Sequence, residues 1–275
     1  MLKDITLGQF FPGNSPLHKM DPRMKIIISA IFIVAIFFAK NIFSFALLIL
    51  FSLILTTLSG IKHSVILKGL KPIVFIVVFT AIINIFWTKG ETPLINFGII
   101  KIYPEGIYTA AFMIIRVVSL VVGTSLLLSY TTSPIALTDA LERLMNPLKK
   151  LKVPVHEFAM MMTIALRFIP TLIEETEKIM NAQKARGADF ESGNLLNRLK
   201  ALVPILIPLF ISAFRRADEL AVAMECRCYH GGDGRTKMKI LRFSVFDFVW
   251  LFVMLIFSVS VFCLNYIPTT IKLSF

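Results

Sequence analysis

Two arginines, Arg186 and Arg227, lie 41 positions apart, and each ends a segment with helical spacing of apolar residues. One interpretation is structural, because a cation at the end of a helix complements the partial negative charge of the helix C-terminus. The other is recognition of a partner, because a planar guanidinium can donate paired hydrogen bonds to carboxylates or backbone carbonyl groups. Two such tips predict two sockets, as a symmetric or pseudosymmetric dimer would offer.

The sequence contains no motif that is typical of catalysis. The glycine-rich stretch 231–237 lacks the Gly-Lys-Ser/Thr ending that places a lysine on phosphates, so we do not expect the chain to hydrolyse ATP by itself. HExxH and GxSxG motifs are absent, and the four histidines are scattered. Cys226, Cys228 and His230 are close in sequence, but side chains two positions apart diverge on a helix and no fourth ligand is apparent. We therefore expect no metal, cofactor or catalytic residues.

The elements that must position the arginines are those of a membrane protein. Of 275 residues, 56% are hydrophobic and only 17% are charged, against about 25% in soluble domains. The mean hydropathy is +0.78, which excludes a soluble globular protein. Three cysteines cannot form a disulfide framework. The net charge of +12 on so apolar a chain indicates basic cytoplasmic loops, and no nucleic-acid partner is expected.

Five apolar runs predict transmembrane helices, at about 26–39, 42–59, 72–88, 107–130 and 244–268. The first run has 14 residues and would reach about 21 Å, which is short of the ~30 Å hydrocarbon core. Lys25 and Lys40 must therefore extend toward the interface, or the helix must rely on its neighbours.

Charge asymmetry predicts the orientation of these spans. With the N-terminus placed inside, most of the 29 Lys and Arg residues fall in cytoplasmic segments. The exceptions are Arg116, within the fourth span, and four outside lysines: Lys40, Lys89, Lys101 and Lys272. This predicts a cytoplasmic N-terminus and an external C-terminus. We expect no cleavable signal, because the first 25 residues are polar and lack a small-residue cleavage site.

The stretch 131–243 has a helical pattern, although it suits neither a soluble domain nor further spans. Its apolar runs at 158–166 and 201–214 are too short to cross a bilayer. We expect three prolines to interrupt them: Pro170, Pro204 and Pro208. These segments fit helices along the membrane surface, which form two long arms ending at Arg186 and Arg227.

The sequence as a whole predicts an all-α membrane protein with about five transmembrane helices and long cytoplasmic coupling helices at the membrane surface. The predicted regions are transmembrane helices 1–4 in 1–130, coupling helices in 131–243 and a C-terminal transmembrane helix in 244–275. Gly187, directly after Arg186, predicts a left-handed end to the first arm.

Three motifs, in order, resemble the transmembrane T component of energy-coupling factor transporters, and the resemblance covers essentially the whole chain. They are Asp-Ile-Thr-Leu-Gly-Gln-Phe at 4–10 with Ser-Pro-Leu-His at 15–18 and Asp-Pro-Arg-Met-Lys at 21–25, then Ala185-Arg186-Gly187, then Glu225-Cys226-Arg227-Cys228 with 229–236. The third motif departs from the family pattern, because cysteines stand at its Ala and Gly positions. A cysteine at the glycine position disfavours a left-handed stop at 228, so we expect the second arm to end later, near Gly231.

The resemblance implies a scaffold that joins two ABC-type ATPases, as a homodimer or heterodimer, to a small membrane-embedded S component that captures a vitamin or another micronutrient. Five tip residues would contact the ATPases: Ala185, Arg186, Gly187, Glu225 and Arg227. Motion of the ATPases would then tilt the S component in a prokaryotic plasma membrane. The alternative is a stand-alone secondary transporter or permease of a small solute, which would need a substrate cavity at mid-membrane. An intramembrane hydrolase would need a nucleophile and a base at membrane depth, and neither is visible.

Three consecutive methionines, Met160, Met161 and Met162, have two interpretations. They could fill a core, or they could form an adaptable surface that repacks against different S components. The opening motif resembles that of the shared type of T component, which serves several interchangeable S components.

Arg116 is a lone cation within the fourth predicted span, and such a residue needs a partner, water or the interface. Asn84 on the third span, or a backbone carbonyl, is the expected contact, with a structural role favoured over one in substrate movement. Asp247, at the start of the last span, is expected at the cytoplasmic interface near Arg242.

Overall fold

The computed structural model describes residues 10–88, 95–97, 100–188, 190, 195–232 and 241–267. The opening motif at 4–9 and the last part of the third motif, 233–236, lie outside the described residues. The chain divides into two compact units. Unit 1 comprises Met1–Leu7 and Thr138–Ile240, and unit 2 comprises Gly8–Leu137 and Leu241–Phe275.

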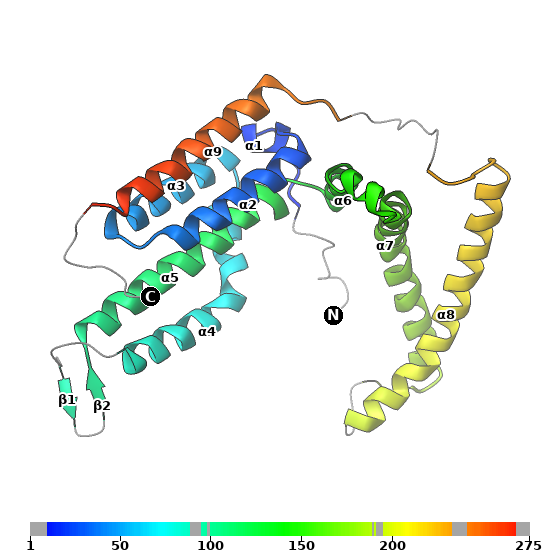
Figure 1. Ribbon diagram of the computed structural model, residues 1–275. Helices are drawn as coiled ribbons and strands as arrows, with labels where there is room; N and C mark the ends of the chain where they lie inside the picture. Colours follow the sequence, from blue (N-terminus) through cyan, green and yellow to red (C-terminus); the bar gives the residue numbers. More distant parts are fainter. Residues whose placement is uncertain are drawn as a thin grey trace. The chain divides into compact units, whose positions relative to one another are not determined.

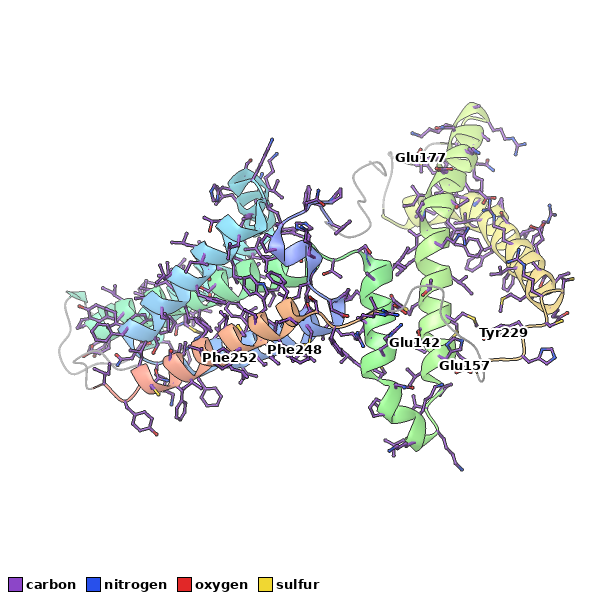
Figure 2. All side chains as sticks on the ribbon, turned by 90° about the horizontal axis from the view of Figure 1, so that it is seen from above. Glu142, Glu157, Glu177, Tyr229, Phe248 and Phe252 are labelled. Carbon is purple, nitrogen blue, oxygen red and sulfur yellow. The ribbon has the colours of Figure 1, made fainter. Side chains whose placement is uncertain are left out.

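Unit 2 is a bundle of helices that are apolar along most of their length (Figure 1). Its helices are α1 (Pro16–Lys19), α2 (Pro22–Phe38), α3 (Ile42–Ser59), α4 (His63–Trp87), α5 (Pro104–Thr124) with a π-helical turn at Ser125–Ser129, and α9 (Val245–Leu264). Phe248 and Phe252 on α9 are exposed and point away from the bundle, as lipid-facing side chains do (Figure 2).

One short hairpin interrupts the helices, and the sequence did not predict it. Strands β1 (Ile95–Phe97) and β2 (Ile100–Ile102) pair antiparallel, with Ile95 opposite Ile102. The all-α class of the prediction is nevertheless confirmed, because all the other regular elements in the described part of the chain are helical.

In the described part of the chain, five helices are long and apolar enough to cross a membrane: α3, α4, α5 with its π turn, α7 (Val155–Ala185) and α9. Four of them coincide with predicted spans. The predicted first span corresponds to α2, whose 17 residues reach about 25 Å. The other candidate, α7, belongs to the predicted surface arms, and its mean hydropathy of 1.2 is well below the 2.2–2.4 of the four.

The arms of unit 1 are continuous helices. Unit 1 contains most of α6 (Pro134–Leu144), a 3-10 helix (Asn146–Leu151), α7 and α8 (Leu195–Glu225). The prediction that prolines interrupt the arms is wrong, because α7 runs through Pro170 and α8 runs through Pro204 and Pro208. A proline removes one backbone hydrogen bond and can bend a helix, but the helix continues where the turns on both sides of the proline are stable. Each 31-residue arm is therefore about 46 Å long.

Aromatic packing holds the centre of unit 2 together. The Phe32 side chain is fully buried, and the Phe51 and Phe257 rings stack with their centroids 4.1 Å apart beside it. Gly123 on α5 lets Phe32 approach the backbone, since a Cβ there would lie 2.0 Å from the ring. Phe32 and Gly123 thus fix how closely α2 and α5 pack.

A buried polar junction, formed by Asp21, Arg23, Lys25 and Asp247, ties together one end of three helices in unit 2. The Asp21 carboxylate caps α2 by accepting the Arg23 N–H at 2.9 Å, and it also pairs with the Arg23 guanidinium at 2.8 Å. Lys25 Nζ donates to the Thr131 carbonyl at 2.8 Å and to the Thr131 and Thr132 hydroxyls. The start of α2 is thereby joined to the chain segment that follows α5.

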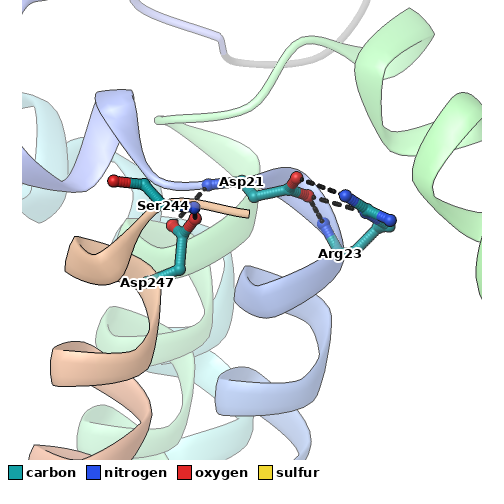
Figure 3. Close-up of polar contacts among 4 residues, drawn as sticks. All are labelled: Asp21, Arg23, Ser244 and Asp247. Atoms are coloured by element: carbon teal, nitrogen blue, oxygen red, sulfur yellow. Dashed lines mark hydrogen bonds and ion pairs between the residues drawn. The ribbon is translucent and has the colours of Figure 1, made fainter. Parts of the chain in front are cut away.

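Asp247 joins α9 to the same junction. Its Oδ1 accepts the Asp21 N–H at 2.9 Å, and its Oδ2 accepts the Ser244 N–H at 2.8 Å in a capping box (Figure 3). Asp247 is only 2% exposed, whereas Arg242 is exposed. The carboxylate expected near Arg242 therefore binds backbone N–H groups of α2 and α9 instead.

Candidate functional site: two arginine-tipped arms

The first arm ends in a Schellman turn. α7 ends at Ala185, Arg186 caps the helix, and Gly187 follows with φ +88°. The Gly187 N–H donates to the Lys184 carbonyl, and the Ala188 N–H donates to the Gln183 carbonyl, both at 3.0 Å. This pair of bonds satisfies helix carbonyls that would otherwise be open, and it requires a left-handed residue at 187. The prediction of a left-handed end at Gly187 is confirmed.

The second arm ends in the same turn, although a cysteine takes the left-handed position. The Cys228 N–H donates to the Glu225 carbonyl at 2.8 Å, and the Tyr229 N–H donates to the Met224 carbonyl at 3.1 Å. Cys228 has φ +55°. The prediction that this arm ends later, near Gly231, is therefore wrong. The two closing hydrogen bonds offset the ~1–2 kcal/mol that a left-handed conformation costs a residue with a Cβ.

Both arginines occupy the same place in their turns. Arg186 and Arg227 each directly precede the left-handed residue, and both side chains are exposed. Ala185, Gly187 and Glu225, the other predicted tip residues, are exposed too. Neither guanidinium has a hydrogen bond or an ion pair to the described part of the chain. The tips therefore present two exposed cations on the same type of helix-ending turn.

The arms pack antiparallel in unit 1, so the tips lie at opposite ends of the pair. Arg216 Nη2 on α8 donates to Glu175 Oε2 on α7 at 2.8 Å. Nearer the first tip, Gln183 Nε2 donates to the Pro204 carbonyl at 3.5 Å. Figure 1 shows α7 and α8 running in opposite directions, close together toward the start of α8 and farther apart toward its end.

Comparison with known proteins supplies the family of a chain with this architecture. The family model described as a cobalt transport protein, CbiQ, matches residues 13–240. The energy-coupling factor transporter transmembrane protein EcfT of Ruminiclostridium cellulolyticum is 56% identical over 97% of this chain and 99% of its own length. EcfT of Clostridium kluyveri is 57% identical over 90% of this chain and 92% of its own length, and that of Bacillus subtilis is 50% identical over 88% and 91%.

The chain belongs to the EcfT family. It is therefore a transmembrane component of an energy-coupling factor transporter and a multi-pass membrane protein. Its relatives are transporter components rather than enzymes.

The methionine group lies on the outside of unit 1. Met161 is 58% exposed and Met162 is 41% exposed, while Met160 is half-buried on the same helix, α7. Met161 and Met162 are therefore not core residues of unit 1, and their role as an adaptable contact surface stays a prediction.

Arg116 has a structural partner in unit 2. The side chain is buried, its Nη2 donates to the Ala39 carbonyl at 2.7 Å, and its guanidinium lies 5.5 Å from the centre of the Phe45 ring. Ala39 is the C-cap of α2, so Arg116 binds a carbonyl that the helix leaves open. Asn84, the other expected partner, donates from Nδ2 to the Thr80 carbonyl of its own helix at 2.8 Å. The expected backbone contact of Arg116 is thus present.

Sequence reasoning missed the polar junction as a contact between distant helices. The capping box Ser244 to Asp247 was readable from the sequence as a serine followed three residues later by an acidic residue. The contact of Asp247 with Asp21, 226 positions away, had no such local signal.

Proposed function

We propose that this EcfT chain couples two ABC-type ATPases, as a homodimer or heterodimer, to an S component for the uptake of a vitamin or another micronutrient. The observation that carries the proposal is the pair of tips, which place Arg186 and Arg227 on the same exposed turn. Two equivalent tips fit two equivalent grooves. A guanidinium that forks onto carboxylates or carbonyls in such a groove gives attachment with a fixed orientation.

The arms are built to transmit displacement. Each is a single helix of 31 residues, and the Glu175–Arg216 ion pair braces one against the other. Packed helices move as units, because interdigitated side chains resist continuous deformation. Motion of the ATPases at the tips would therefore shift whole arms. The contacts of the arms with the S component would then differ between the two states of the ATPases, and coupling requires such a difference.

Exposed apolar residues on the arms supply a surface for the S component and the membrane interface. On α8, Phe210, Ile211 and Phe214 are 58–68% exposed, which is costly in water. On α7, Met160, Met161 and Met162 offer flexible, polarisable side chains that suit several interchangeable S components.

The placement of charge supports a cytoplasmic N-terminus and an external C-terminus in a prokaryotic cell membrane. In that orientation, stretch 131–243 with both arms faces the compartment that holds ATP. The regions 1–130 and 244–275 would then anchor the scaffold in the bilayer.

Co-purification of the ATPases with this chain tests the proposal. We expect the double variant Arg186→Ala and Arg227→Ala to lose the ATPases at least a hundredfold, because truncating one partner of a buried charged contact costs about 2–5 kcal/mol. Arg215→Ala is the matched control, since Arg215 is an exposed arginine on α8 away from the tip. Full retention of ATPases by the double variant, or solute transport by the chain alone in liposomes, contradicts coupling and favours a stand-alone permease.

A further inference from the structure

The chain turns back after the second tip and rests on the beginning of α7. Gly231, with φ +98°, makes the reversal, and Gly232 then lies against His156. A Cβ on Gly232 would lie 2.4 Å from Cδ2 and 3.1 Å from Cβ of His156. Figure 2 shows Glu142, Glu157 and Tyr229 at the end of α7 opposite to Glu177. The backbone that follows the second tip thus meets α7 at close range.

The His156 ring is held in place from its other side. His156 Nδ1 lies 2.9 Å from Glu142 Oε1 on α6, and both side chains are largely buried. The ring therefore links three elements of unit 1: α6, the start of α7 and the chain beyond α8. Its Nε2 is buried and makes no hydrogen bond to residues that the structure describes. A ring fixed in this way cannot move aside without giving up its bond to Glu142.

The left-handed residue of the first tip, Gly187, has open space beside it. A Cβ on Gly187 would meet nothing within 4 Å in the described parts of the chain. The two tips therefore share a backbone turn, and among the described residues the contact of a following glycine with His156 belongs to the second tip.

We propose that the Glu142–His156 pair is a positioning site for the second tip. By receiving Gly232, it sets where Arg227 stands relative to α6 and α7, so that the second ATPase contact is made by a tip in a fixed position. This inference rests on the proposed function, because its consequence is read in ATPase attachment. His156 and Glu142 act through Arg227 and touch no partner themselves.

Gly232→Ala is the primary test. Gly232 does not have a positive φ, so alanine disturbs the contact with His156 and leaves the backbone conformation acceptable. In an Arg186→Ala background, where only the second tip attaches, we expect Gly232→Ala to reduce ATPase affinity about tenfold, which corresponds to about 1.4 kcal/mol. In an Arg227→Ala background, the same change should alter affinity less than twofold. Equal losses in both backgrounds, or no loss in either, overturn the positioning role.

Two further variants separate positioning from general destabilisation. In a His156→Ala chain the ring that Gly232→Ala would strike is gone, so Gly232→Ala should cause no additional loss; additive losses contradict the contact. Glu142→Gln keeps an oxygen acceptor for Nδ1 and should restore attachment through the second tip, whereas Glu142→Ala should not. Equal effects of Glu142→Gln and Glu142→Ala also contradict the proposal.

A disulfide tests the contact independently of the ATPases. His156→Cys with Gly232→Cys, in a chain whose native cysteines are replaced (Cys226→Ala, Cys228→Gly, Cys263→Ala), should cross-link after a small separation of the two residues, since their Cβ positions are 3.1 Å apart and a disulfide needs about 3.5–4.5 Å. The cross-linked chain should keep ATPase binding through the second tip. Absence of the cross-link, or loss of binding once it forms, overturns the proposal. If neither arginine matters for attachment although the cross-link forms, the proposed function fails instead, and the positioning role falls with it.

Discussion

The contacts that stabilise unit 2 internally differ from those that stabilise unit 1. In unit 2, helix ends meet through buried polar groups such as Lys25 and Asp247, each 2% exposed, around a packed aromatic centre. In unit 1, the arms meet through the partly exposed Glu175–Arg216 pair, and large apolar side chains are exposed on the arms, as they also are on the outside of unit 2. Buried contacts of the first kind stabilise a fixed bundle. Contacts of the second kind suit elements that become covered only when partners assemble.

The strongest test of this contrast is Lys25→Met in unit 2. Methionine keeps the length of the side chain but removes the donor to the Thr131 carbonyl and to the Thr131 and Thr132 hydroxyls. We expect the free energy of unfolding to fall by about 2–4 kcal/mol, because buried acceptors that lose their donor cost about 1–3 kcal/mol each. Thermal unfolding of the purified chain in detergent measures this. Lys19→Met, at an exposed lysine, is the control, and equal midpoints for the two variants would remove the distinction.

The aromatic centre of unit 2 offers a second test. A methyl group on Gly123 would strike the Phe32 ring, so Gly123→Ala should destabilise the bundle by about 1–3 kcal/mol through overpacking. Combining it with Phe32→Leu should recover part of that loss, because the smaller side chain gives room. Thermal unfolding of the single and double variants measures the coupling. Strictly additive losses would show that α2 and α5 do not meet through these two residues.

The sequence revealed more of unit 2 than of unit 1, for a physical reason. Apolar runs long enough to span a bilayer carry their own signal, so four spans agreed with the structure, and 42–59 agreed to the residue. The tips were located from Arg186 and Arg227 and their spacing. The continuity of the arms through Pro170 was missed, because a proline read locally predicts a break while the flanking turns decide the outcome.

The second tip shows the same limit on a smaller scale. Residue type alone made Cys228 a poor candidate for a left-handed turn, yet the two closing hydrogen bonds impose that conformation. The contact of Gly232 with His156 and that of Asp21 with Asp247 join positions far apart in the chain. A single sequence contains no local pattern that predicts such contacts between distant residues.

In unit 1, breaking the brace between the arms should have little effect on stability. Glu175→Ala removes the partner of Arg216, and both side chains keep appreciable exposure, so we expect a loss of at most about 1 kcal/mol that shrinks further in high salt. Spin labels on α7 and α8 should nevertheless report a broader distribution of distances between the arms. Glu174→Ala, at an exposed neighbour, is the matched control. A stability loss as large as that of Lys25→Met would contradict the contrast between the units.

The smallest effects are expected from exchanging the left-handed residues of the two tips. Cys228→Gly relieves a Cβ at φ +55° but adds freedom to the unfolded chain, so the second tip should gain about 0.5–1 kcal/mol. Gly187→Cys introduces the same Cβ at φ +88° and should weaken the first tip by a similar amount. Amide hydrogen exchange at 187–188 and 228–229 measures the stability of each turn directly, since these N–H groups donate the hydrogen bonds that close the two turns. Opposite changes in protection at the two tips would show that the closing hydrogen bonds define the turn. Glycine would then only lower the free-energy cost of the left-handed conformation. Complete loss of protection in Gly187→Cys would show instead that the first tip depends on its glycine.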